Sequence, residues 1–154
     1  VAFNSDSITI GAYVFYNLVY AAISYPMGML ADRFSPRTIV IAGFILFAIV
    51  YAGFAFSPSV SEIFILFALY GIYAAATEGV IKAWISNLAH GENTATAIGF
   101  YTSCESIGTL LASIIAGGLW TWCGSDYTFF VPAAVSIFVS FYLLVLKVKK
   151  SGTG

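Results

Sequence analysis

Long apolar stretches alternate with short polar segments along the whole chain, and charged residues interrupt the third and fourth of these stretches. Five of these stretches are long enough to cross the hydrocarbon layer of a bilayer as helices, which takes about 20 residues each. They cover residues 9–31, 37–57, 62–87, 95–120 and 127–147. The pattern therefore predicts an all-α fold, a polytopic membrane bundle of five transmembrane helices.

Composition supports the same fold class. Hydrophobic residues make up 60% of the 154 residues and charged residues only 8%, whereas charged residues make up about a quarter of a soluble domain. The chain is long enough for five spans and too short to hold an additional soluble domain. Its net charge of -1 and its scattered basic residues give no face that could grip phosphate, so we expect no nucleic-acid partner.

The basic residues all fall on one side of the predicted membrane. They follow the first span (Arg33, Arg37), end the third (Lys82) and follow the fifth (Lys147, Lys149, Lys150). Short loops rich in Lys and Arg normally face the cytoplasm. We therefore expect an external N-terminus, a cytoplasmic C-terminus and an odd number of helices.

The polar segment between the first two spans carries a motif. Residues 28–37 read Gly-Met-Leu-Ala-Asp-Arg-Phe-Ser-Pro-Arg. This resembles the loop G-x-L-A-D-R-x-G-R-R/K between the second and third helices of each half of a major facilitator superfamily (MFS) transporter. The matching residues are Gly28, Leu30, Ala31, Asp32, Arg33 and Arg37. The resemblance implies that the loop locks and releases the cytoplasmic side during alternating access; the alternative is a short basic loop that only obeys the charge bias.

Two positions of the motif differ from the family pattern. Ser35 replaces the expected glycine, and Pro36 replaces the first expected basic residue. Ser is a favoured helix N-cap and Pro fits the first helical position, so this pair is expected to begin the next helix.

The resemblance also places the chain within the family fold. The loop follows the first span rather than the second, the chain opens on Val1, and it ends in a Lys-rich tail. Segments 77–79, 96–99 and 116–120 are similar to the tenth and eleventh helices of certain bacterial members. The resemblance thus implies one unit, residues 1–154, that forms helices eight to twelve, the C-terminal half of the fold. The partner would be the N-terminal half of the same polypeptide, in a bacterial cytoplasmic (inner) membrane.

Glu105 is the sharpest candidate for a functional side chain. It lies a few residues from the middle of the fourth span, where a carboxylate costs about 2.5 to 3.5 kcal/mol. Helical steps of three, four, seven and eleven from it reach Gly108, Thr109, Ala112 and Ala116, a small-residue face suited to close helix contact. We therefore expect Glu105 to point into the protein, where burial favours the protonated form that proton coupling requires. The alternative is a protonated Glu that only hydrogen-bonds a neighbouring helix.

Glu78 and Lys82 form a second candidate pair. They are four residues apart with the acid on the N-terminal side, the favourable orientation for an ion pair within a helix. Gly71, Ala75 and Gly79 recur at the same spacing, so tight packing of this helix is expected. The pair is interpreted as structural, with a gate or an ion relay as the alternative.

The first span carries a polar and aromatic stripe at helical spacing. It comprises Tyr13, Tyr16, Asn17, Tyr20, Ser24 and Gly28. Aromatic rings with hydroxyl tips can stack on a ligand and hydrogen-bond to it, so the stripe is a candidate lining for a solute cavity. Tyrosines also serve at membrane interfaces and in helix packing, which is the alternative reading.

No enzymatic or metal chemistry is indicated. His90 is the single histidine and has no nearby imidazole or thiol partners, and the two cysteines are separated by roughly 28 Å of helix. Nucleophile elbows, phosphate loops and paired catalytic carboxylates are not found. We expect neither an enzyme nor a bound cofactor or metal.

The leading hypothesis is secondary active transport of a small solute by alternating access, coupled to protons. It follows from the family resemblance and from the carboxylates within the spans. A membrane sensor or scaffold that retains the fold without transporting is the alternative. A channel is less favoured because no span carries a filter motif.

Overall fold

The computed structural model describes residues 2–56, 59–89 and 93–146 of the 154. These residues form five helices: α1 (Ala2–Arg33), α2 (Pro36–Ala55), α3 (Val60–Leu88), α4 (Thr94–Cys123) and α5 (Ser125–Val145). Every one is long and apolar enough to cross a membrane. The described part of the chain thus confirms the all-α membrane fold. Apart from the start of α1, each helix end lies within three residues of its predicted position.

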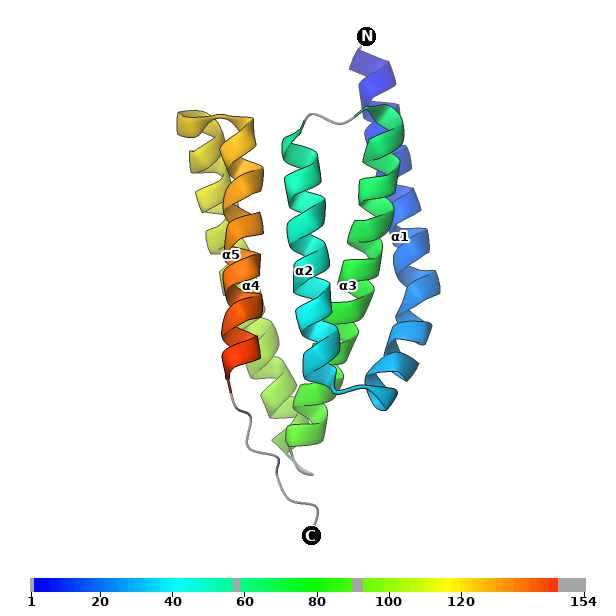
Figure 1. Ribbon diagram of the computed structural model, residues 1–154, viewed down its shortest axis with the longest axis vertical. Coiled ribbons are helices and arrows are strands. Elements are labelled where there is room, and N and C mark those ends of the chain that lie inside the picture. The colour runs from blue at the N-terminus through cyan, green and yellow to red at the C-terminus, as the bar shows by residue number, and fades with distance from the viewer. Residues whose placement is uncertain (1, 57–58, 90–92, 147–154) are drawn as a thin grey trace.

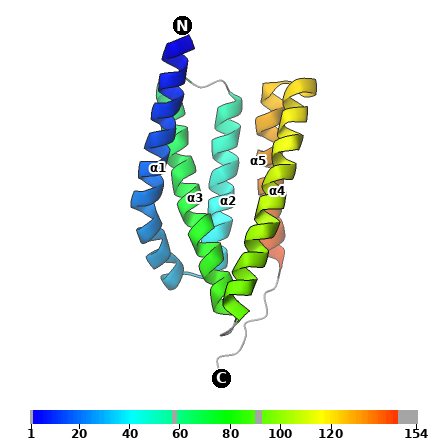
Figure 2. The ribbon, with the colours of Figure 1, turned by 180° about the vertical axis from the view of Figure 1, so that it is seen from behind.

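The helices run up and down in a bundle whose layers Figure 1 shows. α3 packs against both α1 and α2, and the other side of α2 packs against α5. α4 lies along α5 and has fewer contacts with α3. Figure 2 shows that α3 and α4 approach each other at one end of the bundle and diverge toward the other. One side of α4 is therefore left open along much of its length.

Apolar and aromatic side chains fill the space between the helices. Near the loop that joins α1 to α2, Ile39 and Val40 pack against Ala76 and Val80 of α3. The other half of the bundle is aromatic, with a set of rings from α2, α3 and α5 in mutual contact. Ser136 of α5 adds an interhelical hydrogen bond, donating from its hydroxyl to the carbonyl of Phe44 over 2.9 Å. The bundle is thus held by packing and by sparse polar contacts, as expected in lipid.

Glycine lets α3 approach both of its neighbours closely. A Cβ atom placed on Gly71 would lie 3.0 Å from the carbonyl oxygen of Tyr16, and one on Gly43 would lie 2.7 Å from the Thr77 methyl group. Ala75 is only 3% exposed. The predicted packing face of Gly71, Ala75 and Gly79 is therefore confirmed at Gly71 and Ala75. The prediction of tight packing is wrong at Gly79, because a Cβ there would meet nothing within 4 Å. The reason is that α3 turns Gly79 toward a pocket beside α1.

The helix junctions follow local chemistry. Pro36 is the first residue of α2 and Ser35 occupies the N-cap position, as predicted, although the serine side chain makes no capping bond. The Ser35 carbonyl instead accepts the Thr38 amide at 2.8 Å. At the start of α3, the Ser59 amide donates to the Glu62 carboxylate at 2.6 Å within a capping box. α4 passes to α5 through the single residue Gly124, whose φ of 95° favours glycine.

Candidate functional site

The charged residues of the loop motif have two different environments. Asp32 and Arg33 are exposed at the end of α1. Arg37, in the first turn of α2, is half-buried and donates from its guanidinium group to the carbonyls of Leu143 and Leu146. These carbonyls lie in the last turn of α5 and at its C-cap, where helix geometry leaves oxygens without partners and favours a positive charge. Arg37 therefore ties α2 to the end of α5, while the other two charges stay accessible.

Glu78 has a partner on another helix. Its carboxylate accepts a hydrogen bond from the Tyr20 hydroxyl of α1, at 3.2 Å. The four-residue spacing predicted Lys82 as its partner, and Lys82 is half-buried one turn further along α3. Close packing of α1 on α3, made possible at Gly71, brings Tyr20 within reach. The structure thus joins Glu78 to the aromatic stripe of α1, two candidates that the sequence treated separately.

Glu105 is half-buried on α4, one turn after Tyr101. The Tyr101 hydroxyl interacts with the Glu105 carboxylate and also lies in the electrostatic field of Glu78. Tyr101 is thus a partner of Glu105, whereas the partner that the structure shows for Glu78 is Tyr20 of α1. Sequence reasoning overlooked Tyr101, although its position four residues before Glu105 places both side chains on one helix face.

Among the described residues, no helix makes the close contact that was predicted for the small-residue face next to Glu105. A Cβ on Gly108 would meet nothing within 4 Å, and α4 has no buried residue among those described. Thr109, Ala112 and Ala116 line an open groove instead. α4 diverges from α3 away from the end where they meet (Figure 2), and within the described chain no helix covers this face.

The aromatic stripe of α1 splits into a packed and an exposed part. The Tyr16 ring lies 5.3 Å from the Tyr70 ring of α3, measured between centroids. Tyr13 is 61% exposed, and its backbone carbonyl accepts a hydrogen bond from the side-chain Nδ2 of Asn17 at 2.8 Å. Toward the loop, a pocket of about 330 Å³ lies between α1 and α3; its lining includes Tyr20, Ser24, Gly28, Asp32 and Gly79. The structure therefore brings the stripe, the loop aspartate and the Glu78 region to one side of the bundle.

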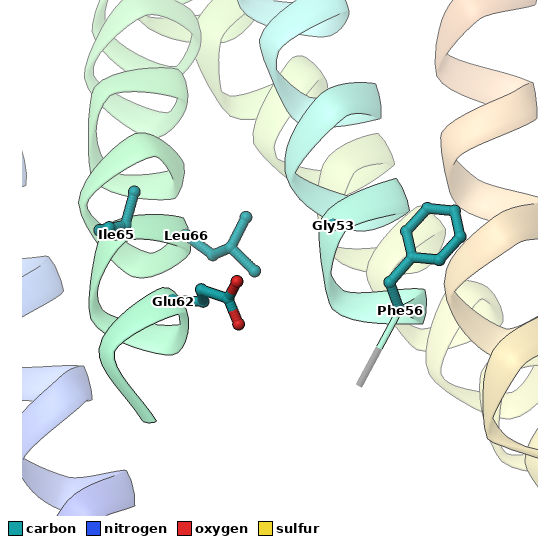
Figure 3. Close-up of a pocket in the computed structure, with 5 residues that line it drawn as sticks. All are labelled: Gly53, Phe56, Glu62, Ile65 and Leu66. Atoms are coloured by element: carbon teal, nitrogen blue, oxygen red, sulfur yellow. The ribbon is translucent and has the colours of Figure 1, made fainter. Parts of the chain in front are cut away.

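A separate pocket lies at the opposite end of the bundle, between the end of α2 and the start of α3. It measures about 290 Å³ and is lined by Gly53, Phe56, Glu62, Ile65 and Leu66. Figure 3 shows the carboxylate of Glu62 beside Leu66 and facing the gap toward Gly53. Glu62 is engaged in the capping box and lies roughly 24 Å along α3 from Glu78. This pocket is therefore separate from the candidate site.

The described residues hold no cluster of three His, Cys, Asp or Glu side chains that could bind a metal ion. His90 and the tail lysines Lys147, Lys149 and Lys150 lie outside the described residues. Both cysteines, Cys104 and Cys123, are free and exposed.

Known proteins resemble this chain over most of its length. An uncharacterized MFS-type transporter of Methanocaldococcus jannaschii is 36% identical over 139 residues, 90% of this chain and 35% of the relative. The tetracycline resistance protein, class C, of Escherichia coli is 32% identical over 75% of this chain and 30% of its own length. The multidrug efflux pump LfrA of Mycolicibacterium smegmatis is 33% identical over 68% of this chain and 21% of its own length. No solved structure is significantly similar.

The chain thus spans about a third or less of these relatives. The sequence profile of the Major Facilitator Superfamily matches residues 2–153, which includes the loop motif and all five helices. These matches and the five helices show an integral membrane protein whose relatives include transporters. The chain belongs to the major facilitator superfamily.

Proposed function

We propose that the full-length protein containing this chain is a proton-coupled secondary active transporter of a small solute. The observation that carries the proposal is a pair of carboxylates on two membrane-spanning helices: Glu78 of α3, which accepts a hydrogen bond from Tyr20, and Glu105 of α4, which is half-buried. Ionisable groups at this depth are costly and are retained chiefly where they handle ions or substrates. The names of two relatives, an efflux pump and a resistance protein, support transport of a small organic solute.

In this proposal the chain forms helices eight to twelve, and the solute path runs between it and an N-terminal half of the same polypeptide. The length relation to the relatives and the presence of five described membrane helices support this division. The exposed side of α1, with Tyr13 and Asn17, and the pocket lined by Tyr20 and Ser24 would face the path. Alternating access would then occur by rocking of the two halves about this site.

The loop motif would control the cytoplasmic end. Arg37 is engaged with α5, so it serves as an anchor, whereas Asp32 and Arg33 are exposed and can contact a second half of the protein. Breaking and forming those contacts would release and lock the cytoplasmic side. In this proposal the protein lies in a bacterial cytoplasmic membrane, with the loop motif on the cytoplasmic side. The basic residues of the loop support this orientation, because short basic loops normally face the cytoplasm.

Neutralising each carboxylate in the full-length protein tests the proposal. Glu105→Gln and Glu78→Gln should each abolish solute flux driven by a pH gradient across proteoliposomes, while solute exchange without a gradient persists. Glu62→Gln is the matched control, because glutamine preserves the capping box at that position. Its flux should equal that of the unmodified protein.

Unchanged gradient-driven flux in both variants would remove the carboxylates from the mechanism. Absence of any flux in the unmodified protein, with a solute-dependent shift in its denaturation temperature, would instead favour a sensor or scaffold that binds without transporting.

A further inference from the structure

A hydrogen bond joins α1 to α3 within the described chain. The Tyr20 hydroxyl of α1 donates to the Oε2 atom of Glu78 of α3 over 3.2 Å, although 58 positions separate the two residues in the sequence. The two helices lie side by side in both views of the bundle (Figures 1 and 2) and pack closely against each other. Both partners of this bond therefore belong to elements that the structure places in contact.

Packing holds the Tyr20 ring in place independently of its hydroxyl group. Gly71 lets α1 approach α3, because a Cβ atom there would lie 3.0 Å from the carbonyl oxygen of Tyr16. The Tyr16 ring lies 6.3 Å from the Tyr20 ring, at an interplanar angle of 28°, and 5.3 Å from the Tyr70 ring of α3. Removal of the Tyr20 hydroxyl alone should therefore leave α1 seated on α3.

The donor and the acceptor of this bond respond differently to pH. A tyrosine hydroxyl has an ordinary pKa of about 10 and keeps its proton near neutral pH. An ionised carboxylate can only accept hydrogen bonds, and it accepts them more strongly than a neutral carboxyl group does. A hydrogen bond to the charged form of a group favours that form. The Tyr20 hydroxyl is therefore placed to favour the ionised form of Glu78.

Several other titratable groups lie on the helices that meet near Glu78. They are Tyr16 of α1, Tyr70, Tyr73 and Lys82 of α3, and Tyr101 and Glu105 of α4. α2 adds Arg37, which bonds to α5, and Tyr51, whose ring lies 6.3 Å from that of Tyr70. Among the described residues, the hydroxyl that donates to the Glu78 carboxylate is that of Tyr20. Tyr20 is therefore the side chain whose removal changes the hydrogen bonding of Glu78 directly.

We propose that Tyr20 is a positioning residue for Glu78: its hydroxyl holds the carboxylate toward α1 and favours the ionised form. This inference rests on the proposed function, in which Glu78 takes up and releases the coupling proton, and it adds the residue that sets the pH at which Glu78 does so. If Tyr20 served only to pack α1 on α3, loss of its hydroxyl would leave the protonation of Glu78 unchanged.

The test is Tyr20→Phe in the full-length protein, because this change removes the hydroxyl and keeps the ring. Infrared spectroscopy in lipid membranes follows the carbonyl band of the protonated Glu78 side chain, which is identified by its loss in Glu78→Gln. The titration midpoint of this band should rise by about one pH unit in Tyr20→Phe, about a tenfold change in proton affinity, which is the scale of one hydrogen bond to a charged group. Tyr25→Phe is the matched control, since Tyr25 lies on the same helix and is 75% exposed; its midpoint should be unchanged.

Flux in proteoliposomes supplies a second readout. Gradient-driven flux should persist in Tyr20→Phe, and the pH at which it is half-maximal should rise by about the same amount. An unchanged infrared midpoint in Tyr20→Phe would overturn the role of Tyr20, and so would a Glu78→Gln variant that loses no titrating carboxyl band. A shifted infrared midpoint without a shifted flux profile would instead support the role of Tyr20 and reject Glu78 as the coupling group, so the inference and the proposed function fail in different measurements.

Discussion

At the residue scale, Arg37 carries a contact that its neighbour Arg33 does not. Both belong to the loop motif and have the same charge, yet only Arg37 reaches the last carbonyls of α5. Hydrogen bonds to charged groups contribute roughly 1.5 to 3 kcal/mol. Arg37→Met should therefore lower the denaturation midpoint of the full-length protein by several degrees, measured by tryptophan fluorescence in detergent.

Arg33→Met is the matched control for this prediction, since it removes an equal charge from an exposed site of the same loop. Its midpoint should stay within a degree or so of the unmodified protein. A comparable loss in both variants would mean that loop charge, rather than the contact with α5, governs stability.

Glycine positions on α3 and α4 differ in a way that sequence spacing does not reveal. A Cβ on Gly71 would lie only 3.0 Å from a backbone oxygen of α1, whereas one on Gly108 would meet nothing within 4 Å. Backbone cannot yield as a flexible side chain does, so Gly71→Leu should separate α1 from α3 and cost roughly 1 to 3 kcal/mol or more. Gly108→Leu should cost far less, and reversible unfolding in mixed micelles measures both.

At the element scale, the passage from α4 to α5 depends on one backbone conformation. Gly124 has φ 95° and ψ 172°, a region that is nearly exclusive to glycine. Gly124→Ala should therefore destabilise the α4–α5 pair by roughly 1 to 3 kcal/mol. Gly79→Ala should have the opposite sign, because Gly79 is helical with free space around it and alanine favours the helix by up to about 1 kcal/mol.

The sign difference between the two glycine variants is the diagnostic outcome. Thermal unfolding of the purified protein should move downward for Gly124→Ala and upward or not at all for Gly79→Ala. A stabilising Gly124→Ala would show that the junction does not hold the positive φ angle in the membrane.

At the scale of the whole molecule, the topology makes a prediction about accessibility. Cys123 ends α4 at the opposite end of the bundle from the loop that contains Ser35. With the other cysteines replaced by serine, a membrane-impermeant maleimide should label Cys123 on intact cells. A Ser35→Cys variant that lacks Cys123 should react only after the membrane is permeabilised.

External labelling of Ser35→Cys on intact cells would reverse the orientation and with it the role assigned to the loop motif. Labelling of both positions from outside would instead indicate that one of the five helices does not cross the bilayer. The two outcomes differ at Cys123. In a reversed orientation Cys123 would be protected while Ser35→Cys reacts, whereas in the second case both sites would react.

Sequence alone determined the membrane fold class, the approximate spans and the loop motif. These are local properties: the length of an uncharged stretch decides whether it can cross lipid, and Lys and Arg in short loops decide which side they face. Periodicity also grouped residues correctly on a shared face, such as Tyr16 with Tyr20, whose rings lie 6.3 Å apart. The start of α2 at Ser35 and Pro36 followed from backbone preferences of those two residues.

Only the tertiary structure decided what lies opposite each face. Glu78 is paired with Tyr20, 58 residues earlier, and Arg37 with carbonyls more than 100 residues later, because helix packing sets these neighbours. Gly71 and Gly79 have the same spacing pattern, yet one contacts a backbone and the other open space. A helix of known periodicity can rotate and tilt in many ways, and the crossing geometry of its neighbours selects among them.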